Sequence, residues 1–180
     1  RSTLFPYTTL FRSGRYTGTL LSSLIRVFTR DKYCHCSLAL DKDLNEMYSF
    51  GRLTAYNPLV GGFTREGIHF GTFKRFKKTT SEVLELKVTD KSYKKIIEII
   101  DEYKHKRERY GYDFIGLVVA ISGKKFKRPK HFYCSDFVKD VFNRAGVDNN
   151  LPKIPKPEDF KKIKNTRLIY EGLLRQYNGA

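Results

Sequence analysis

One cysteine at the start of a predicted helix is the residue of this sequence best suited to chemistry. Cys134 opens a segment, residues 134–145, whose apolar side chains recur at helical spacing and which Gly146 would close. A helix N-terminus stabilises a thiolate through its unpaired N–H groups and its dipole. Free cysteine is also among the most buried residue types, so simple core packing is the alternative. A base from elsewhere in the chain decides between the two interpretations.

The chain holds four histidines that could be this base: His35, His69, His105 and His131. His105 lies in a charged helix end and His131 in a basic loop, so both are expected to be solvated. His69 falls within a predicted strand, where a sheet-surface role is expected. His35 opens another predicted strand, where a hydrogen-bonded structural histidine is the interpretation that composition alone favours and a base for Cys134 is the alternative.

The strand that begins at His35 alternates between two kinds of side chain. His35, Ser37 and Ala39 share one face, and the apolar Cys36 belongs to the other. We expect the Cys36 face against the core. The small residues beside His35 would let the helix of Cys134 approach on their side.

The cysteine count argues against both a disulfide framework and a zinc site. Cys34, Cys36 and Cys134 are an odd number without repeated spacing, which favours a reducing compartment, so a cytoplasmic location is predicted. Cys34 and Cys36 cannot easily face one ion together with His35, because neighbours on a strand alternate. We predict no metal and no cofactor.

Around these residues the sequence predicts an α+β domain, with an antiparallel sheet and helices packed on one side of it. A hairpin over 35–41 and 46–52 is followed by a loop over 53–66. The further predicted strands are 67–73, 81–89 and 166–172, and the predicted helices are 17–28, 90–103, 112–122, 134–145 and 157–163. The stretch 114–121, FIGLVVAI, is apolar but too short to span a bilayer.

Three segments together resemble a known enzyme family. They are YCHCSLALDKDLNEMYSFGR at 33–52, YGYDFIGL at 110–117 and FYCSDFVKDVF at 132–142. The set is similar to the permuted papain-like amidases of bacteria, the YiiX-like, circularly permuted branch of the NlpC-type cysteine hydrolase superfamily, which is related to lecithin retinol acyltransferase. In that family the histidine strand precedes the cysteine helix. The resemblance covers most of residues 17–173 and implies a permuted papain-like fold.

The resemblance assigns roles to individual residues. Cys134 matches the family's nucleophile and His35 its base. The group that orients the imidazole usually comes from the next strand, where Ser49 is the match and where relatives often carry Glu or His. Glu46 would point to the opposite face and is the poorer candidate.

A Tyr-Asp pair before a helix also matches the family. Tyr112 and Asp113 would bind substrate under this resemblance. From the residues alone, the alternative is structural, with Asp113 as a helix cap and Tyr112 packed beneath it.

The implied activity is cleavage of an amide or peptide bond through a thiolate acyl-enzyme mechanism. Acyl transfer of the lipid acyltransferase or thioesterase type on the same site is one alternative. A non-catalytic basic module that binds nucleic acid or anionic lipid is another. The expected partner is an amide-, peptide- or acyl-containing substrate.

The charge of the chain favours contact with anions but does not name one. Thirty-five Lys and Arg against 19 Asp and Glu give a net charge of +16. The basic runs, at 74–78, 104–109 and 124–130, are most simply solvated surface. An anionic polymer or membrane surface fits this charge, whereas nucleic acid is disfavoured because none of its recognition motifs is visible.

Residues 1–13 have an unusual composition. RSTLFPYTTLFRS lacks an initial Met and resembles translated sequencing-adapter text. We predict that this segment is non-native and that it replaces an original first strand or start. The single hydrolase domain is expected to span 14–180.

Overall fold

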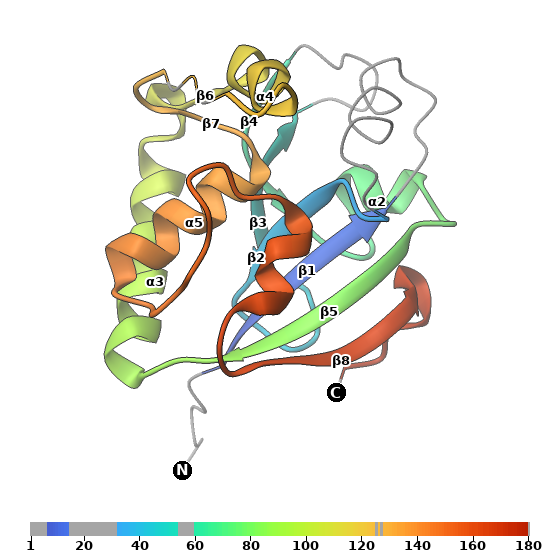
Figure 1. Ribbon diagram of the computed structural model, residues 1–180. Helices are drawn as coiled ribbons and strands as arrows, with labels where there is room; N and C mark the ends of the chain where they lie inside the picture. The colour runs from blue at the N-terminus through green and yellow to red at the C-terminus, as the bar shows by residue number, and fades with distance from the viewer. Residues whose placement is uncertain (1–6, 15–31, 54–59, 125, 127, 180) are drawn as a thin grey trace.

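The computed structural model describes residues 7–14, 32–53, 60–124, 126 and 128–179 (Figure 1). Its strands are β1 Tyr7–Gly14, β2 His35–Ala39, β3 Met47–Arg52, β4 Gly61–Glu66, β5 Thr80–Lys87, β6 Gly111–Tyr112, β7 His131–Phe132 and β8 Thr166–Leu173. Its helices are α2 Gly71–Arg75, α3 Asp90–His105, α4 Phe114–Ile121 and α5 Cys134–Ala145, with short 3₁₀ turns η1 Arg107–Arg109, η2 Pro157–Lys162 and η3 Leu174–Gln176. The prediction of an α+β class is confirmed.

Six strands form one antiparallel sheet in the order β4-β3-β2-β1-β5-β8. The predicted hairpin is present as β2 and β3, in which Leu38 pairs with Tyr48. Strand β1 consists mostly of residues from the N-terminal segment that resembles adapter text, and it lies in the middle of the sheet between β2 and β5. That segment therefore occupies the place of a first strand.

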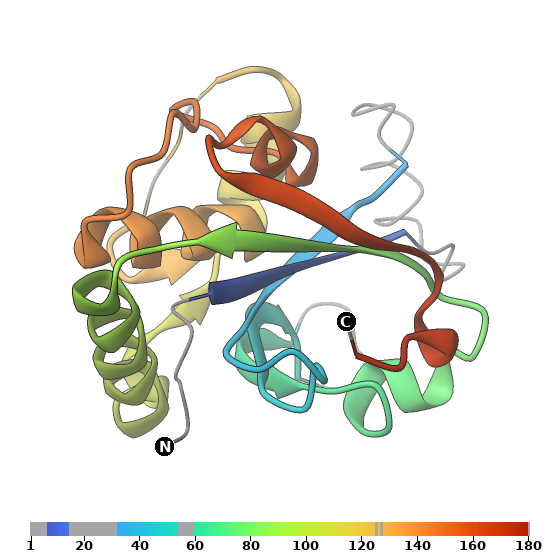
Figure 2. The same cartoon turned by 90° about the horizontal axis from the view of Figure 1, so that it is seen from below.

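The two long helices cover one face of the sheet (Figure 2). Helix α3 begins where Thr89 accepts a hydrogen bond from the Ser92 N–H at 3.1 Å, as its sequence predicts. Helix α5 ends at Gly146, whose φ of 66° is the left-handed conformation that glycine adopts without strain. Both helices pack on the sheet through a buried aromatic cluster: Phe50, Phe63, Tyr103, Phe132 and Phe137.

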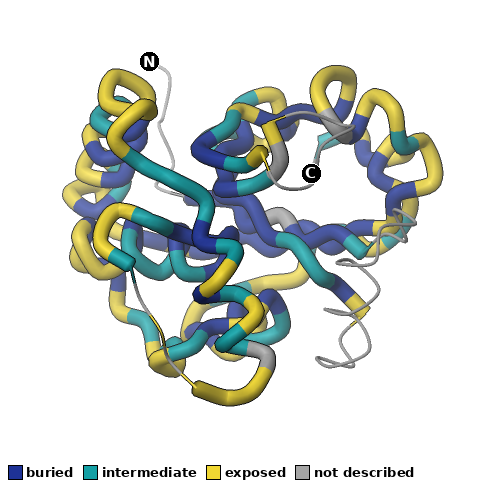
Figure 3. The backbone as a smooth tube through the Cα atoms, turned by 90° about the horizontal axis from the view of Figure 1, so that it is seen from above, coloured by how far each residue is buried: buried dark blue, intermediate teal, exposed yellow. Residues whose placement is uncertain are grey.

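The opposite face of the sheet has smaller elements. Helix α2 and turn η3 lie there, where Phe73 and Leu174 pack against Ala39 and Met47 of the hairpin. Helices on one side only were predicted, and the structure differs because α2, after β4, and η3, after β8, both pack on this second face. Figure 3 shows buried backbone through the middle of the molecule and exposed segments around its edge.

Two predicted elements along this part of the chain are wrong. The loop expected over 53–66 contains β4, and the strand expected over 67–73 is a turn followed by α2. Gly61 and Gly62 suggested a loop, yet these glycines pair with Arg52 and Gly51 of β3. The helix predicted over 17–28 lies outside the described residues.

Helix α4 is less buried than its apolar sequence suggests. Ile115 and Val118 are 49% and 46% exposed, although a buried helix was expected here. Asp113 begins this helix by accepting a hydrogen bond from the Gly116 N–H at 2.9 Å. Within the described ranges, no helix has the length and apolarity needed to cross a bilayer.

Candidate active site

Cys134 is the first residue of α5 and points into the interior. The helix carries its apolar residues on one face, so the sequence of α5 itself turns Cys134 toward the sheet, where it is 8% exposed. Tyr133 is the N-cap and, within the described part of the chain, its side chain makes no capping hydrogen bond. The N–H groups of the first turn are therefore left for another acceptor, since the helix itself cannot pair them.

The entry to α5 is held by a short parallel pair of strands. Tyr112 in β6 pairs with Phe132 in β7, and the Asp113 N–H donates to the Phe132 carbonyl at 2.9 Å. The Arg128 guanidinium donates to Asp113 at 3.0 Å and to the Tyr112 carbonyl at 3.2 Å. Tyr112 and Asp113 thus hold the backbone that leads into Cys134. Asp113 also caps α4, which agrees with the structural role that the sequence alone allowed for this pair. Substrate binding by the pair stays a prediction.

His35 begins β2 and is held by a buried carboxylate. Its Nε2 lies 3.2 Å and 3.1 Å from the two oxygens of Glu66, at the end of β4. The Ser37 hydroxyl donates to the same carboxylate at 2.5 Å and lies 3.3 Å from Nε2. The side chain of Cys134 also hydrogen-bonds to the imidazole. A carboxylate, an imidazole and a thiol thus form one chain of contacts.

The electrostatics of this chain favour an ion pair of thiolate and imidazolium. Burial disfavours the imidazolium, but the charge of Glu66 and the hydrogen bonds to Cys134 and Glu66 outweigh it, so the pKa of His35 is raised well above its ordinary value. Burial likewise disfavours a charged Glu66, yet His35 and Ser37 outweigh it and lower the pKa of this carboxyl. Glu66 therefore stays ionised beside a protonated ring.

The pKa of the Cys134 thiol is shifted together with those of His35 and Glu66. A hydrogen bond from the Cys36 side chain, with the hydrogen bond and charge of His35, outweighs burial and lowers the pKa of Cys134 well below its ordinary value. The backbone N–H of Cys36 also donates to this sulfur. Burial and the neighbouring Cys134 raise the pKa of the Cys36 thiol well above its usual range. The surroundings thus favour ionisation of the Cys134 thiol over that of the Cys36 thiol.

The approach of Cys134 to His35 differs from the predicted one. Helix α5 packs on the apolar face of β2, the face of Cys36 and Leu38, and not on the face of His35. The large apolar surface of α5 is buried there, while Phe73 of α2 covers the His35 side with its ring centroid 6.4 Å from the imidazole. Cys134 meets His35 because each begins its element, so both lie at the same end of the sheet.

Ser49 was the residue predicted to orient the imidazole, and the structure gives that contact to Glu66. Ser49 lies on the same face of the sheet, close enough to lower the pKa of Glu66. Its buried hydroxyl has no well-formed hydrogen bond among the described residues. Glu46, the poorer candidate, is 4.0 Å from Arg65 at the surface.

Glu66 could have been found from the sequence only through β4. GGFTRE alternates about the core residue Phe63, which pairs with Phe50 of β3. In that register Glu66 faces the same side as Ser49, because its partner Met47 lies two residues before Ser49. The alternation is weak in the sequence because Gly61 and Gly62, which are typical of loops, begin the segment.

The remaining histidines and Cys34 lie apart from this chain of contacts. His105 and His131 each use Nδ1 on a backbone carbonyl at 2.8 Å, those of Asp101 and Pro129. The Cys34 sulfur lies 4.0 Å from the Ser13 carbonyl. Over the described ranges, no three His, Cys, Asp or Glu side chains are grouped to hold a metal ion.

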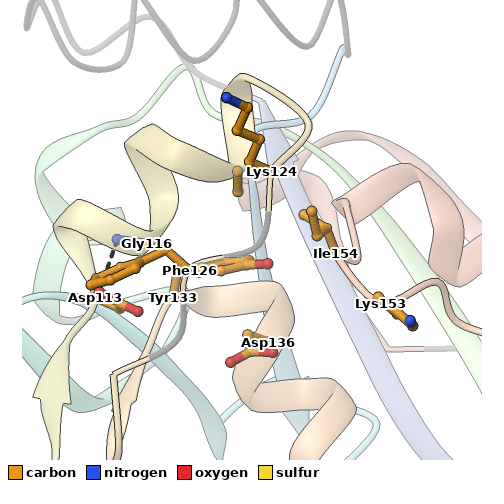
Figure 4. A pocket seen from close by; sticks show the side chains of 9 residues that line it. Asp113, Gly116, Lys124, Phe126, Tyr133, Asp136, Lys153 and Ile154 are labelled. Carbon is orange, nitrogen blue, oxygen red and sulfur yellow. Dashed lines mark hydrogen bonds between the residues drawn. The ribbon is translucent and has the colours of Figure 1, made fainter.

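A narrow crevice lies beside the start of α5 (Figure 4). It is lined by Asp113, Gly116, Ala120, Lys124, Phe126, Tyr133, Asp136, Lys153 and Ile154. Its cavity volume is about 10 Å³, room for about one water molecule. Tyr133, just before α5, and Asp136, in its first turn, line the crevice, whereas Cys134 does not line it. A larger hollow of about 540 Å³ lies between β4 and the end of α3; Glu46 lines it, but Cys134, His35 and Glu66 do not.

Comparison with known proteins adds no name to this geometry. No family model matches the chain, and no curated protein matches it.

Proposed function

We propose that this chain is a cysteine hydrolase that cleaves an amide or peptide bond through an acyl-enzyme on Cys134. One observation carries the proposal: Cys134, at the start of α5, contacts His35, whose Nε2 is bound by the buried carboxylate of Glu66. A nucleophile, a base and a group that orients the base are the parts that such catalysis needs.

Activation of the nucleophile follows from the charges already described. His35 holds the thiol proton as imidazolium, which Glu66 stabilises at 3.1 Å. The thiolate is stabilised by the ring and by the N-terminal end of α5. Cys134 is thus prepared to attack without a separate deprotonation at neutral pH.

Attack on a carbonyl carbon makes an oxyanion, and α5 offers donors for it. The sulfur forms a bond to the carbon while the carbonyl π electrons move to oxygen. The N–H groups of the first turn of α5 have no partners within the helix and point toward this charge. His35 then donates its proton to the leaving nitrogen as the C–N bond breaks.

Release of the acyl group reverses these roles. His35, now neutral, removes a proton from water, and the hydroxide oxygen attacks the thioester carbon. The thiolate leaves and the acid product departs. Glu66 keeps the ring in place through both halves of the cycle.

The topology supports the proposal of a permuted papain-like amidase. The histidine strand β2 comes before the cysteine helix α5 in the chain, and the helix packs on an antiparallel sheet. This is the order that the sequence resemblance implies.

The test is the pH dependence of iodoacetamide alkylation at each cysteine, followed by peptide mass spectrometry. Cys134 should react well below the ordinary thiol pKa of about 8.5, and faster than Cys34 and Cys36. His35→Ala should remove this advantage, because the thiolate loses its counter-ion. His105→Ala, which changes an exposed histidine at the end of α3, is the matched control and should leave it intact. Alkylation of Cys134 at an ordinary pH and independent of His35 would contradict the proposal.

A second measurement separates catalysis from binding. An activated ester, p-nitrophenyl acetate, should release a burst of nitrophenolate and leave an acetylated Cys134 peptide that then disappears. An inert chain that is retained on anionic vesicles in a salt-sensitive way would instead indicate a basic binding module.

A further inference from the structure

A second thiol lies against the candidate nucleophile and has no role in the mechanism above. Cys36 is fully buried, and its side chain is hydrogen-bonded to that of Cys134. Both sulfurs also lie near one hydroxyl, with Cys36 Sγ 3.4 Å and Cys134 Sγ 3.8 Å from Ser135 Oγ. Hydrolysis of an amide bond needs only one of these thiols.

We propose that Cys134 and Cys36 form a reversible disulfide when peroxide oxidises the site, so that Cys36 serves as the resolving thiol. The proposal rests on the proposed function to the extent that Cys134 must be the more reactive thiol. Its geometric basis is separate: two buried sulfurs lie on either side of one hydroxyl, that of Ser135, where α5 packs on β2.

The first step is oxidation of Cys134 by hydrogen peroxide. The thiolate sulfur attacks one peroxide oxygen, the O–O bond breaks, and hydroxide leaves with the electron pair. Sulfur loses two electrons and becomes a sulfenic acid, while the peroxide is reduced. The proton held on His35 neutralises the hydroxide to water.

The second step closes the disulfide. The Cys36 thiol gives up its proton, and its sulfur attacks the sulfur of the sulfenic acid. The S–O bond breaks, and the departing hydroxide takes the proton as water. In total, two thiols and one peroxide give one disulfide and two waters, and a dithiol reductant restores both thiols by exchange.

The surroundings of the pair favour this outcome over further oxidation. Apolar neighbours, Leu38 of β2 and Phe137 and Val138 of α5, belong to the same buried cluster as the two cysteines. A neighbouring thiol in contact intercepts the sulfenic acid before a second peroxide reaches it. The disulfide stops hydrolysis, because the nucleophile is consumed, and protects Cys134 from irreversible loss.

Cys34 provides the internal comparison. It precedes Cys36 by two residues, yet it is partly exposed and its sulfur lies 4.0 Å from the Ser13 carbonyl. A disulfide that forms by contact should therefore exclude Cys34.

The test treats the full chain with hydrogen peroxide, blocks remaining thiols with an alkylating reagent, and maps peptides without reduction. We expect a peptide that links Cys134 to Cys36 in the wild type and in Cys34→Ser. In Cys36→Ser, Cys134 should go on to the sulfinic and sulfonic acids. Dithiothreitol should restore thiol reactivity at Cys134 in the wild type but not in Cys36→Ser.

A parallel treatment with diamide separates this inference from the proposed function, because diamide links adjacent thiols without peroxide. Sulfinic acid at Cys134 in the wild type, with no linked peptide from either oxidant, would overturn the inference alone. A linked peptide from diamide, with Cys134 inert to peroxide, would overturn the inference together with the activated thiol. A link through Cys34 would overturn the proposed pairing.

Discussion

The two faces of β2, β3 and β4 are built from alternate residues of the same strands and have opposite characters. One face presents Phe50 and Phe63 to the long helices, in a cluster where ring centroids lie 5.2 to 5.8 Å apart. The other presents His35, Ser49 and Glu66, which are largely buried but polar. Neighbouring residues in the sequence therefore serve different purposes.

The comparison teaches where the stability and the reactivity of this protein reside. The aromatic face needs only apolar volume, so burial stabilises it without directional contacts. The polar face needs each charge paired, since an unpaired buried charge is costly. The polar face therefore depends on the aromatic face to hold the sheet, while the aromatic face does not depend on the charges.

The largest effect is expected at Phe50, on the aromatic face, and concerns the stability of the protein. Phe50→Ala should lower the free energy of unfolding by about 3–5 kcal/mol, because it leaves a cavity among four rings. Chemical denaturation followed by circular dichroism measures this. In the molecules that remain folded, the pH dependence of Cys134 alkylation should be unchanged.

Phe126→Ala is the matched control for the same substitution. Phe126 is 48% exposed, so its loss should cost less than about 0.5 kcal/mol. Equal losses for Phe50 and Phe126 would remove the basis for assigning stability to the aromatic face.

The next effect is expected at Glu66 and concerns reactivity. Glu66→Gln removes the anion that keeps the pKa of His35 high, so that pKa falls. A neutral ring no longer stabilises the thiolate, so the pKa of Cys134 rises and the alkylation profile moves to higher pH. A shift of about one pH unit would slow alkylation about tenfold on the acidic side.

Glu46→Gln provides the comparison for this carboxylate. Glu46 is 4.0 Å from Arg65 and apart from the imidazole, so its amide variant should keep the wild-type profile. An unchanged profile in Glu66→Gln as well would show that Glu66 does not act on the thiol through His35.

The last predictions concern the two serines of the polar face, of which Ser49 should have the smallest effect. Ser37→Ala removes a donor 2.5 Å from the Glu66 carboxylate, a hydrogen bond to a charged group worth about 1.5–3 kcal/mol. Ser49→Ala removes a hydroxyl with no well-formed bond among the described residues, so we expect less than about 0.5 kcal/mol. Thermal unfolding and the alkylation profile of both variants test this order, and a larger effect at Ser49 would return the orienting role to that residue.

The regular parts of the fold could be predicted from periodicity alone. The hairpin of β2 and β3, the cap of α3 at Thr89 and the start of α5 at Cys134 all follow from local patterns. Local patterns are strong there because propensity, capping and burial agree. Local pattern also placed Cys134 and His35 at the starts of their elements, whereas the choice of His35 as the base came from the family resemblance.

The partners of these residues were harder to predict because they depend on pairing between strands. Glu66 lies in a glycine-containing strand whose signal is weak, and its contact with His35 bridges 31 residues. The contact between Cys134 and Cys36 required knowing that α5 packs on the apolar face of β2. The alternation of residues along β2 predicts which side chains share a face of the strand. It does not predict which helix packs on each face.

The positions of the site residues along the chain also set when the thiol becomes reactive during protein synthesis. His35 and Glu66 leave the ribosome long before Cys134, because β2 and β4 precede α5. Until α5 docks on the sheet, Cys134 has neither the imidazole nor the N-terminal end of a packed helix beside it, and it behaves as an ordinary thiol. Under the proposed function, the nascent chain therefore carries no activated nucleophile until α5 has been translated and has docked on the sheet.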